Sequence, residues 1–176
     1  MIRTTEEACV SLSEHSIEFQ RYDHPPVATC EEAALHMRGV PGMGAKNLFL
    51  RNKKGDRYFL VTVGEEIRVD LGKLSEFLGV GRLSFASADR LERHLGVQPG
   101  AVTILALVND SDGLVTAFMD RALAEAPLMQ CHPMENTSTV VMRPGDILDY
   151  LTRHRKAVKI IDIPALELSV EHPLSD

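Results

Sequence analysis

The chain has 176 residues, of which 44% are hydrophobic and 25% charged, proportions of a globular domain that exclude a disordered or fibrous chain. Its 25 acidic and 19 basic side chains give a net charge of −6. That charge argues against a duplex-DNA partner, because a DNA coat must neutralise many phosphates. The negative net charge is still compatible with a local basic patch that binds one RNA end.

No stretch approaches 18 uncharged apolar residues, and the N-terminus lacks a long apolar segment. We therefore expect neither membrane insertion nor secretion. The cysteines, Cys9, Cys30 and Cys131, are odd in number, widely spaced and without a CxxC pair, which predicts free thiols in a reducing cytoplasm. No Cys or His pair has zinc-ligand spacing, so we expect no metal.

Helix and strand patterns alternate along the chain. A T-x-x-E capping box begins each of two predicted helices, over residues 4–14 and 29–39, and residues 17–22 between them read as a strand. Residues 47–51 and 58–63 are apolar strands around a Lys-Lys-Gly-Asp turn, which predicts a hairpin. The remaining patterns predict helices over 70–79, 87–96 and 144–154, and strands over 83–85, 104–108, 114–119, 128–131, 138–142 and 158–163.

These elements favour one α+β domain over residues 1–176. Several hairpins, including a second one expected between 104–108 and 114–119, indicate a mixed, largely antiparallel sheet with surrounding helices. Regular βαβ alternation is missing, which disfavours a doubly wound nucleotide-binding fold.

Two glycine-containing loops could carry chemistry. Residues 39–47 hold three glycines before Lys46 but lack the P-loop pattern, and on residue type alone a flexible connection with a solvated lysine is the better interpretation. Residues 96–103 could direct main-chain N–H groups at a carbonyl oxygen, or could form only a Pro-Gly turn. The pattern leaves both interpretations open.

Two further segments are polar. Cys131 and His132 are adjacent, but neighbours along a strand point to opposite faces, so they do not form a nucleophile–base pair. A single His before Pro is more often structural than catalytic. Arg51, Lys53 and Lys54 make the first hairpin basic, and solvated charges are the default interpretation there.

In order and spacing, five stretches together resemble the YbaK/prolyl-tRNA-synthetase-associated domain family of aminoacyl-tRNA deacylases. The resemblance runs from about His24 to Ile163 and is nearest to the freestanding Ala-tRNA(Pro) deacylase branch. The stretches are Lys46-Asn47-Leu48-Phe49-Leu50, Leu83-Ser84-Phe85-Ala86-Ser87, Leu95-Gly96-Val97-Gln98-Pro99-Gly100, Val108-Asn109-Asp110 and His132-Pro133-Met134-Glu135-Asn136-Thr137.

The resemblance implies a trans-editing enzyme without cofactor that hydrolyses mischarged Ala-tRNA(Pro), and prolyl-tRNA synthetase as a possible partner. A separate, size-selective editing pocket is needed because an apolar contact in the synthetase pocket discriminates between alanine and proline by only about 1–3 kcal/mol. It implies roles in catalysis for Lys46, Gly100, Ala101 and His132, in substrate binding for Asn47, Val102, Thr103, Ile104, Asn136 and Thr137, and in tRNA binding for Arg51, Lys53 and Lys54. Lys46 would hold the terminal phosphate or polarise the substrate, and the 100–103 main chain would stabilise the oxyanion.

The sequence departs from the family at Ile104, where a G-x-x-x-P loop ordinarily ends in Pro, and at Gln130-Cys131, where an Asn-aromatic pair is expected. Ile lacks the fixed φ of Pro. A deacylase for another small aminoacyl group and a non-catalytic module that binds tRNA or a synthetase are therefore the alternatives.

Overall fold

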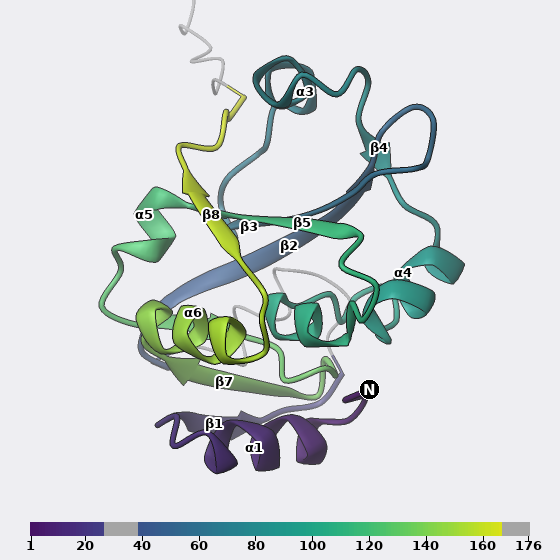
Figure 1. Ribbon diagram of the computed structural model, residues 1–176. Coiled ribbons are helices and arrows are strands. Elements are labelled where there is room, and N and C mark those ends of the chain that lie inside the picture. The colour runs from purple at the N-terminus through teal and green to yellow at the C-terminus, as the bar shows by residue number, and fades with distance from the viewer. Residues whose placement is uncertain (27–38, 167–176) are drawn as a thin grey trace, which may run out of the picture.

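The structure is a computed structural model that describes residues 1–26 and 39–166. Within these ranges the strands form one mixed sheet with helices on both of its faces (Figure 1). The strands are β1 (Gln20–Asp23), β2 (Met43–Arg51), β3 (Tyr58–Gly64), β4 (Ser84–Phe85), β5 (Val115–Asp120), β6 (Met129–Cys131), β7 (Ser138–Met142) and β8 (Val158–Ile161). The helices are α1 (Thr5–Glu14), α3 (Leu71–Leu78), α4 (Ala88–Leu95), α5 (Arg121–Ala124), α6 (Pro144–Arg153) and the 3₁₀ helix η1 (Ile104–Asn109).

The sheet confirms the predicted α+β class and its mixed character. Its strand order is β1-β7-β6-β2-β3-β5-β8, and β4 pairs with the end of β2. The β1–β7, β6–β7, β2–β3 and β2–β4 pairs are antiparallel, whereas the β2–β6, β3–β5 and β5–β8 pairs are parallel. Strand β2 is thus the junction between the two halves of the sheet.

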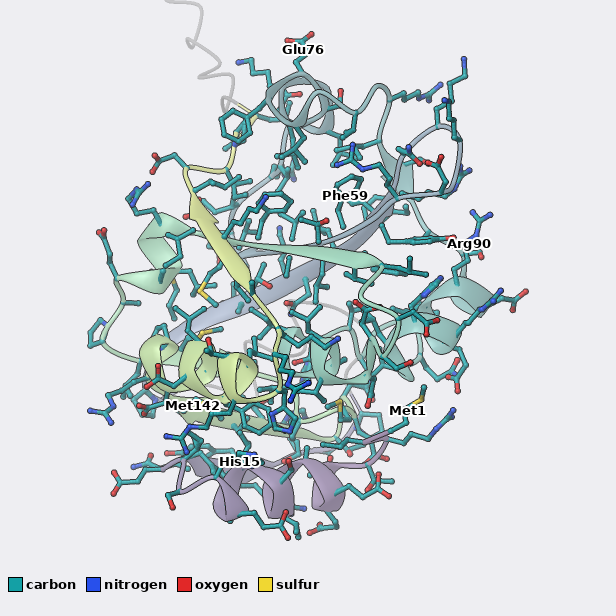
Figure 2. All side chains as sticks on the ribbon, in the orientation of Figure 1. Met1, His15, Phe59, Glu76, Arg90 and Met142 are labelled. Atoms are coloured by element: carbon teal, nitrogen blue, oxygen red, sulfur yellow. The ribbon has the colours of Figure 1, made fainter. Side chains whose placement is uncertain are left out.

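Successive residues of β2 face two different hydrophobic cores. Phe49 packs in the larger core, with residues from α1, α4, η1 and α6. Leu50 packs in the second core with Phe59 and with Leu74 of α3. In Figure 1, β3, β5 and β8 lie on one side of α6 and η1, and β1 and β7 lie on the other. Figure 2 shows Phe59 between the sheet and α3.

Local capping signals place several helix ends where the sequence predicts them. The Thr4 hydroxyl accepts from the Glu7 N–H and the Glu7 carboxylate accepts from the Thr4 N–H, so the capping box of α1 is confirmed. Asp70 caps α3, which Gly79 ends at φ 61°. Strand β1 begins later than predicted, and the helix predicted over 29–39 lies almost wholly outside the described residues.

The predicted second hairpin is wrong. Residues 104–108 belong to η1, and β5 pairs in parallel with β3. The run Ile-Leu-Ala-Leu-Val is apolar throughout, and periodicity cannot separate a buried strand from a buried helical turn. The Thr103 hydroxyl accepts from the Leu105 N–H at 3.3 Å and begins the helical turn. The short α5 was not predicted.

In the described part of the chain, no helix has both the length and the apolar character that crossing a bilayer requires. Cys9 and Cys131 are free thiols, as predicted.

Candidate functional site

Asn47 joins the sheet to the 96–103 loop. Its side-chain Nδ2 donates to the Val102 carbonyl at 3.1 Å, and its Oδ1 accepts from the Thr62 hydroxyl at 2.7 Å. Thr62 lies directly opposite Asn47 in the β2–β3 register and is fully buried. The sequence analysis missed Thr62, although one polar residue within an apolar strand was a signal available to it.

The 98–101 segment forms a tight turn. The Ala101 N–H donates to the Gln98 carbonyl at 3.0 Å, with Pro99 second in the turn and Gly100 third at φ 88°. A type II turn requires this positive φ, which glycine adopts without strain. The Pro-Gly turn interpretation is therefore confirmed.

The turn also fixes which main-chain donors the loop can offer. The Ala101 N–H is engaged within the turn, so it is not available to a ligand in this conformation. The N–H groups of Val102 and Thr103 donate to no residue that the structure describes. Two successive N–H groups can bind a carbonyl oxygen or an anion.

Thr103 and Ile104 face the protein interior. Both side chains are fully buried, and Ile104 belongs to the larger core. These two positions therefore support the loop from behind. The whole of each residue is buried, main chain included, so the accessible position among residues 101–104 is Val102, which is half-buried.

Cys131 is not a nucleophile in this conformation. Burial raises the pKa of its thiol to about 12, a rise that the smaller effect of the Thr103 hydrogen bond does not offset. The thiol is therefore protonated at neutral pH, whereas thiol chemistry requires the thiolate.

His132 is half-buried, with its ring 6.5 Å from the His24 ring. Its Nδ1 lies 3.3 Å from the Ser138 carbonyl oxygen. Since a carbonyl only accepts, Nδ1 carries the proton and Nε2 of the neutral ring has a free lone pair. Burial lowers the pKa of His132, although the Ser138 hydrogen bond opposes this, so the neutral ring prevails at pH 7.

The depressed pKa of His132 gives a stability prediction. The unfolded chain gains this proton near pH 6.5 and the folded chain only at lower pH, so the free energy of unfolding falls as pH drops below about 6.5. We expect the Tm of His132→Gln to fall less than that of the wild type between pH 7 and pH 5. Thermal unfolding across this range checks it, and parallel curves would contradict it.

The 132–137 loop meets the turn at one point. A Cβ added to Gly100 would lie 3.8 Å from the Asn136 Nδ2, so the Asn136 amide faces the turn. The Thr137 carbonyl accepts from the His24 N–H at 3.0 Å. The structure therefore brings together the 98–103 turn, Asn47 and the loop that carries Asn136.

Lys46 lies on the other face of β2. Its partner across the strand pair is Val63, which packs in the second core, whereas the Asn47 partner is Thr62. The Lys46 ammonium donates to the Glu65 carbonyl at 2.7 Å. Because neighbouring strand residues alternate between faces, Lys46 and Asn47 lie on opposite faces of β2.

The basic hairpin is also separate from the turn. Arg51 lies five residues beyond Lys46 on β2, about 17 Å at the rise of an extended strand, and the hairpin lies at this far end (Figure 1). The Arg51 guanidinium donates to the carbonyls of Asn52 and Lys53. The basic hairpin therefore lies apart from Lys46 along β2.

In the described part of the chain, no metal site accompanies the predicted site residues, and one surface depression lies apart from them. Among residues 1–26 and 39–166, no group of three or more His, Cys, Asp or Glu side chains could hold a metal ion. An open depression of about 350 Å³ lies beside α5 and the start of α6, and it contains no predicted site residue. Its lining residues are Ala124, Ala126, Pro127, Arg143, Pro144, Gly145, Asp146 and Asp149.

Comparison with known proteins assigns the family. Residues 24–150 match the sequence model of the aminoacyl-tRNA editing domain. The chain is 39% identical over 155 residues to prolyl-tRNA synthetase associated domain-containing protein 1 of Danio rerio, covering 86% of this chain and 84% of that protein. It is 33% identical over 153 residues to prolyl-tRNA editing protein ProX of Acetoanaerobium sticklandii, covering 86% and 93%.

A solved structure described as a candidate trans-editing enzyme for prolyl tRNA synthetase has the same fold. It superposes with a TM-score of 0.69 at 19% identity, covering 94% of this chain and 100% of the other. The matched segment contains Asn47, the 96–103 loop and the 132–137 loop. This chain therefore belongs to the aminoacyl-tRNA editing domain family and is an aminoacyl-tRNA deacylase.

Proposed function

We propose that this protein is a trans-editing hydrolase that cleaves alanine from mischarged Ala-tRNA(Pro) in the cytoplasm. The observation that carries the proposal is the anchored turn, in which Asn47 holds the Val102 carbonyl while the Val102 and Thr103 N–H groups have no described partner. The names of the two relatives, which refer to prolyl-tRNA synthetase and prolyl-tRNA editing, support tRNA(Pro) as the acceptor and the synthetase as a partner.

The reaction needs a water molecule and an oxyanion site. Water attacks the ester carbonyl carbon, the bond to the ribose oxygen breaks, and the ribose oxygen takes a proton while alanine leaves as its acid. The main-chain N–H of Val102, which is half-buried and donates to no described residue, stabilises the negative charge that develops on the carbonyl oxygen. One such donor is worth about 2.7–4 kcal/mol in other enzymes.

His132 and Asn136 complete the site on the opposite loop. The neutral His132 ring can accept a hydrogen bond at Nε2 from the attacking water or from a ribose hydroxyl. Asn136 faces the turn and can hold the substrate across it. The protonated Cys131 thiol supports direct attack by water rather than a covalent intermediate.

Lys46 acts on the tRNA rather than on the ester. Its ammonium is on the opposite face of β2 from Asn47, where it can bind a phosphate of the tRNA end but cannot polarise a carbonyl beside the turn. We expect Lys46→Ala to lower kcat/KM for Ala-tRNA(Pro) about tenfold or more, mainly through KM, because losing one ion pair of about 1.4 kcal/mol or more weakens ground-state binding. Steady-state kinetics check it, and wild-type kcat/KM would remove Lys46 from the mechanism.

Ile104 permits a test of the non-catalytic alternative. Thr103 is extended at φ −141° and ψ 149°, the conformation that proline favours before it, and Ile104 is the first residue of η1. We therefore expect Ile104→Pro to fold and to retain deacylation. Turnover that appears only in Ile104→Pro would show that the wild type is a binding module.

A panel of aminoacyl esters tests the whole proposal. The purified protein is incubated with tRNA(Pro) charged with alanine, serine or proline, and ester loss is compared with buffer. We expect rapid loss of alanine and retention of proline. Equal, buffer-level loss of all esters would refute deacylation, and faster loss of serine would reassign the substrate to another small aminoacyl group.

A further inference from the structure

We propose that Thr62 is a positioning residue for the deacylation reaction, acting through Asn47 on the 98–103 turn; the inference rests on the proposed function. Among the described residues, the Thr62 hydroxyl makes no hydrogen bond to the turn itself. Its hydroxyl donates to the Asn47 Oδ1 at 2.7 Å, and the Asn47 Nδ2 then donates to the Val102 carbonyl at 3.1 Å.

The donors and acceptors in this series of hydrogen bonds can be arranged in only one way. An Asn side chain carries one accepting oxygen and one donating nitrogen, and the Val102 carbonyl can only accept. The Asn47 nitrogen must therefore face Val102, which leaves its oxygen facing β3. A hydroxyl that donates to this oxygen fixes the amide in the orientation that anchors the turn.

Thr62 suits this role because burial and the strand register restrict its side chain. Its side chain is fully buried, and the register fixes it opposite Asn47. A β-branched residue in a strand has few χ1 rotamers, so the hydroxyl stays in place. The Thr103 hydroxyl accepts from the Leu105 N–H at 3.3 Å, a contact that holds the next residue of the loop but does not orient Asn47.

These anchors also account for a loop that ends without proline. Ile104 provides core packing but no fixed φ, whereas the Asn47 side chain holds the Val102 carbonyl and the Thr103 side chain holds the Leu105 N–H. These side-chain hydrogen bonds therefore restrain the donor whose direction determines oxyanion binding.

The test compares Thr62→Val, which keeps the shape and removes the hydroxyl, with Thr62→Ser, which keeps the hydroxyl. We expect Thr62→Val to lower kcat for Ala-tRNA(Pro) about tenfold with KM nearly unchanged, a smaller loss than the hundredfold that a misplacement of about 1 Å can cause. Thr62→Ser should restore most of the rate. In an Asn47→Ala background, Thr62→Val should cause no further loss, since both act through one contact.

Thr5→Val is the matched control. Thr5 is also buried, and its hydroxyl has no hydrogen-bond partner in the described part of the chain. Removing that hydroxyl should leave kcat unchanged. If Thr62→Val and Thr5→Val have the same kcat, or if Thr62→Val and Asn47→Ala losses simply add, the positioning role is overturned.

Amide hydrogen exchange separates this inference from the proposed function. Thr62→Val should exchange faster than the wild type at Ala101 and Leu105, whose N–H groups donate to the Gln98 carbonyl and the Thr103 hydroxyl, with unchanged protection in α6. If the wild type hydrolyses no aminoacyl-tRNA, the proposed function fails while the exchange experiment still decides whether Thr62 orders the turn. Unchanged exchange at both amides would overturn the inference.

Discussion

Asn47→Ala should lower kcat for Ala-tRNA(Pro) about a hundredfold, the loss expected when reacting groups move by about 1 Å. The change removes the donor to the Val102 carbonyl and leaves the buried Thr62 hydroxyl without its acceptor. The turn then loses its connection to β2, and the main-chain donors no longer point at a fixed position. Single-turnover hydrolysis measures this effect separately from tRNA binding.

Two further variants sharpen the Asn47 prediction. Asn47→Asp keeps the shape and still accepts from Thr62 but cannot donate to Val102, so it should be at least as impaired as alanine. Asn52→Ala is the matched control, because the Asn52 amide organises only the hairpin turn, through the N–H groups of Gly55 and Asp56. It should lower Tm without changing kcat. Full activity in Asn47→Asp would exclude the anchoring role.

Gly100→Ala should lower both stability and activity. Gly100 has a φ of 88°, where an L-residue is strained by about 1–3 kcal/mol. The added Cβ would be 3.8 Å from the Asn136 Nδ2, an ordinary contact, so the effect comes from the backbone rather than from a clash. Relief of the strain reorients the peptides that follow, and we expect kcat to fall about a hundredfold.

Gly113→Ala provides the comparison for Gly100→Ala. Gly113 has a φ of 66° and its added Cβ would meet nothing within 4 Å. It lies before β5, away from the turn, so its strain should lower Tm without lowering kcat. Thermal unfolding and single-turnover kinetics on both variants check this, and equal kcat values would show that the turn conformation is irrelevant to the reaction.

The elements predicted correctly are those that local residues determine. The Thr4 capping box, the Asp70 cap and the hairpin between 47–51 and 58–63 each depend on residues a few positions apart. The parallel pairing of β3 with β5 depends on distant segments, so no local pattern indicated it. The 104–108 run was predicted as a strand because its burial on all sides hides any period.

The site was predicted only in part. Resemblance to a family implied roles for Asn47 and the 96–103 loop, which stay predictions, but the pattern could not choose between a Pro-Gly turn and a main-chain binding loop. The structure forms the Pro-Gly turn at residues 98–101, and the Val102 N–H that follows it has no described partner. The turn interpretation therefore applies to 98–101, and the main-chain binding interpretation applies to Val102. The opposite facing of Lys46 and Asn47 could have been predicted from the two-residue period of a strand.

The central claim is that the main-chain N–H of Val102, the accessible donor that follows the turn, binds the acyl carbonyl oxygen. The most direct measurement is the amide NMR spectrum of the ¹⁵N-labelled protein, titrated with adenosine that carries alanine through a non-hydrolysable 3′-amide. The account predicts that the Val102 amide proton shifts downfield, as hydrogen-bonded donors do, and that Asn47→Ala removes the shift. Saturable binding that leaves this amide unshifted would contradict it.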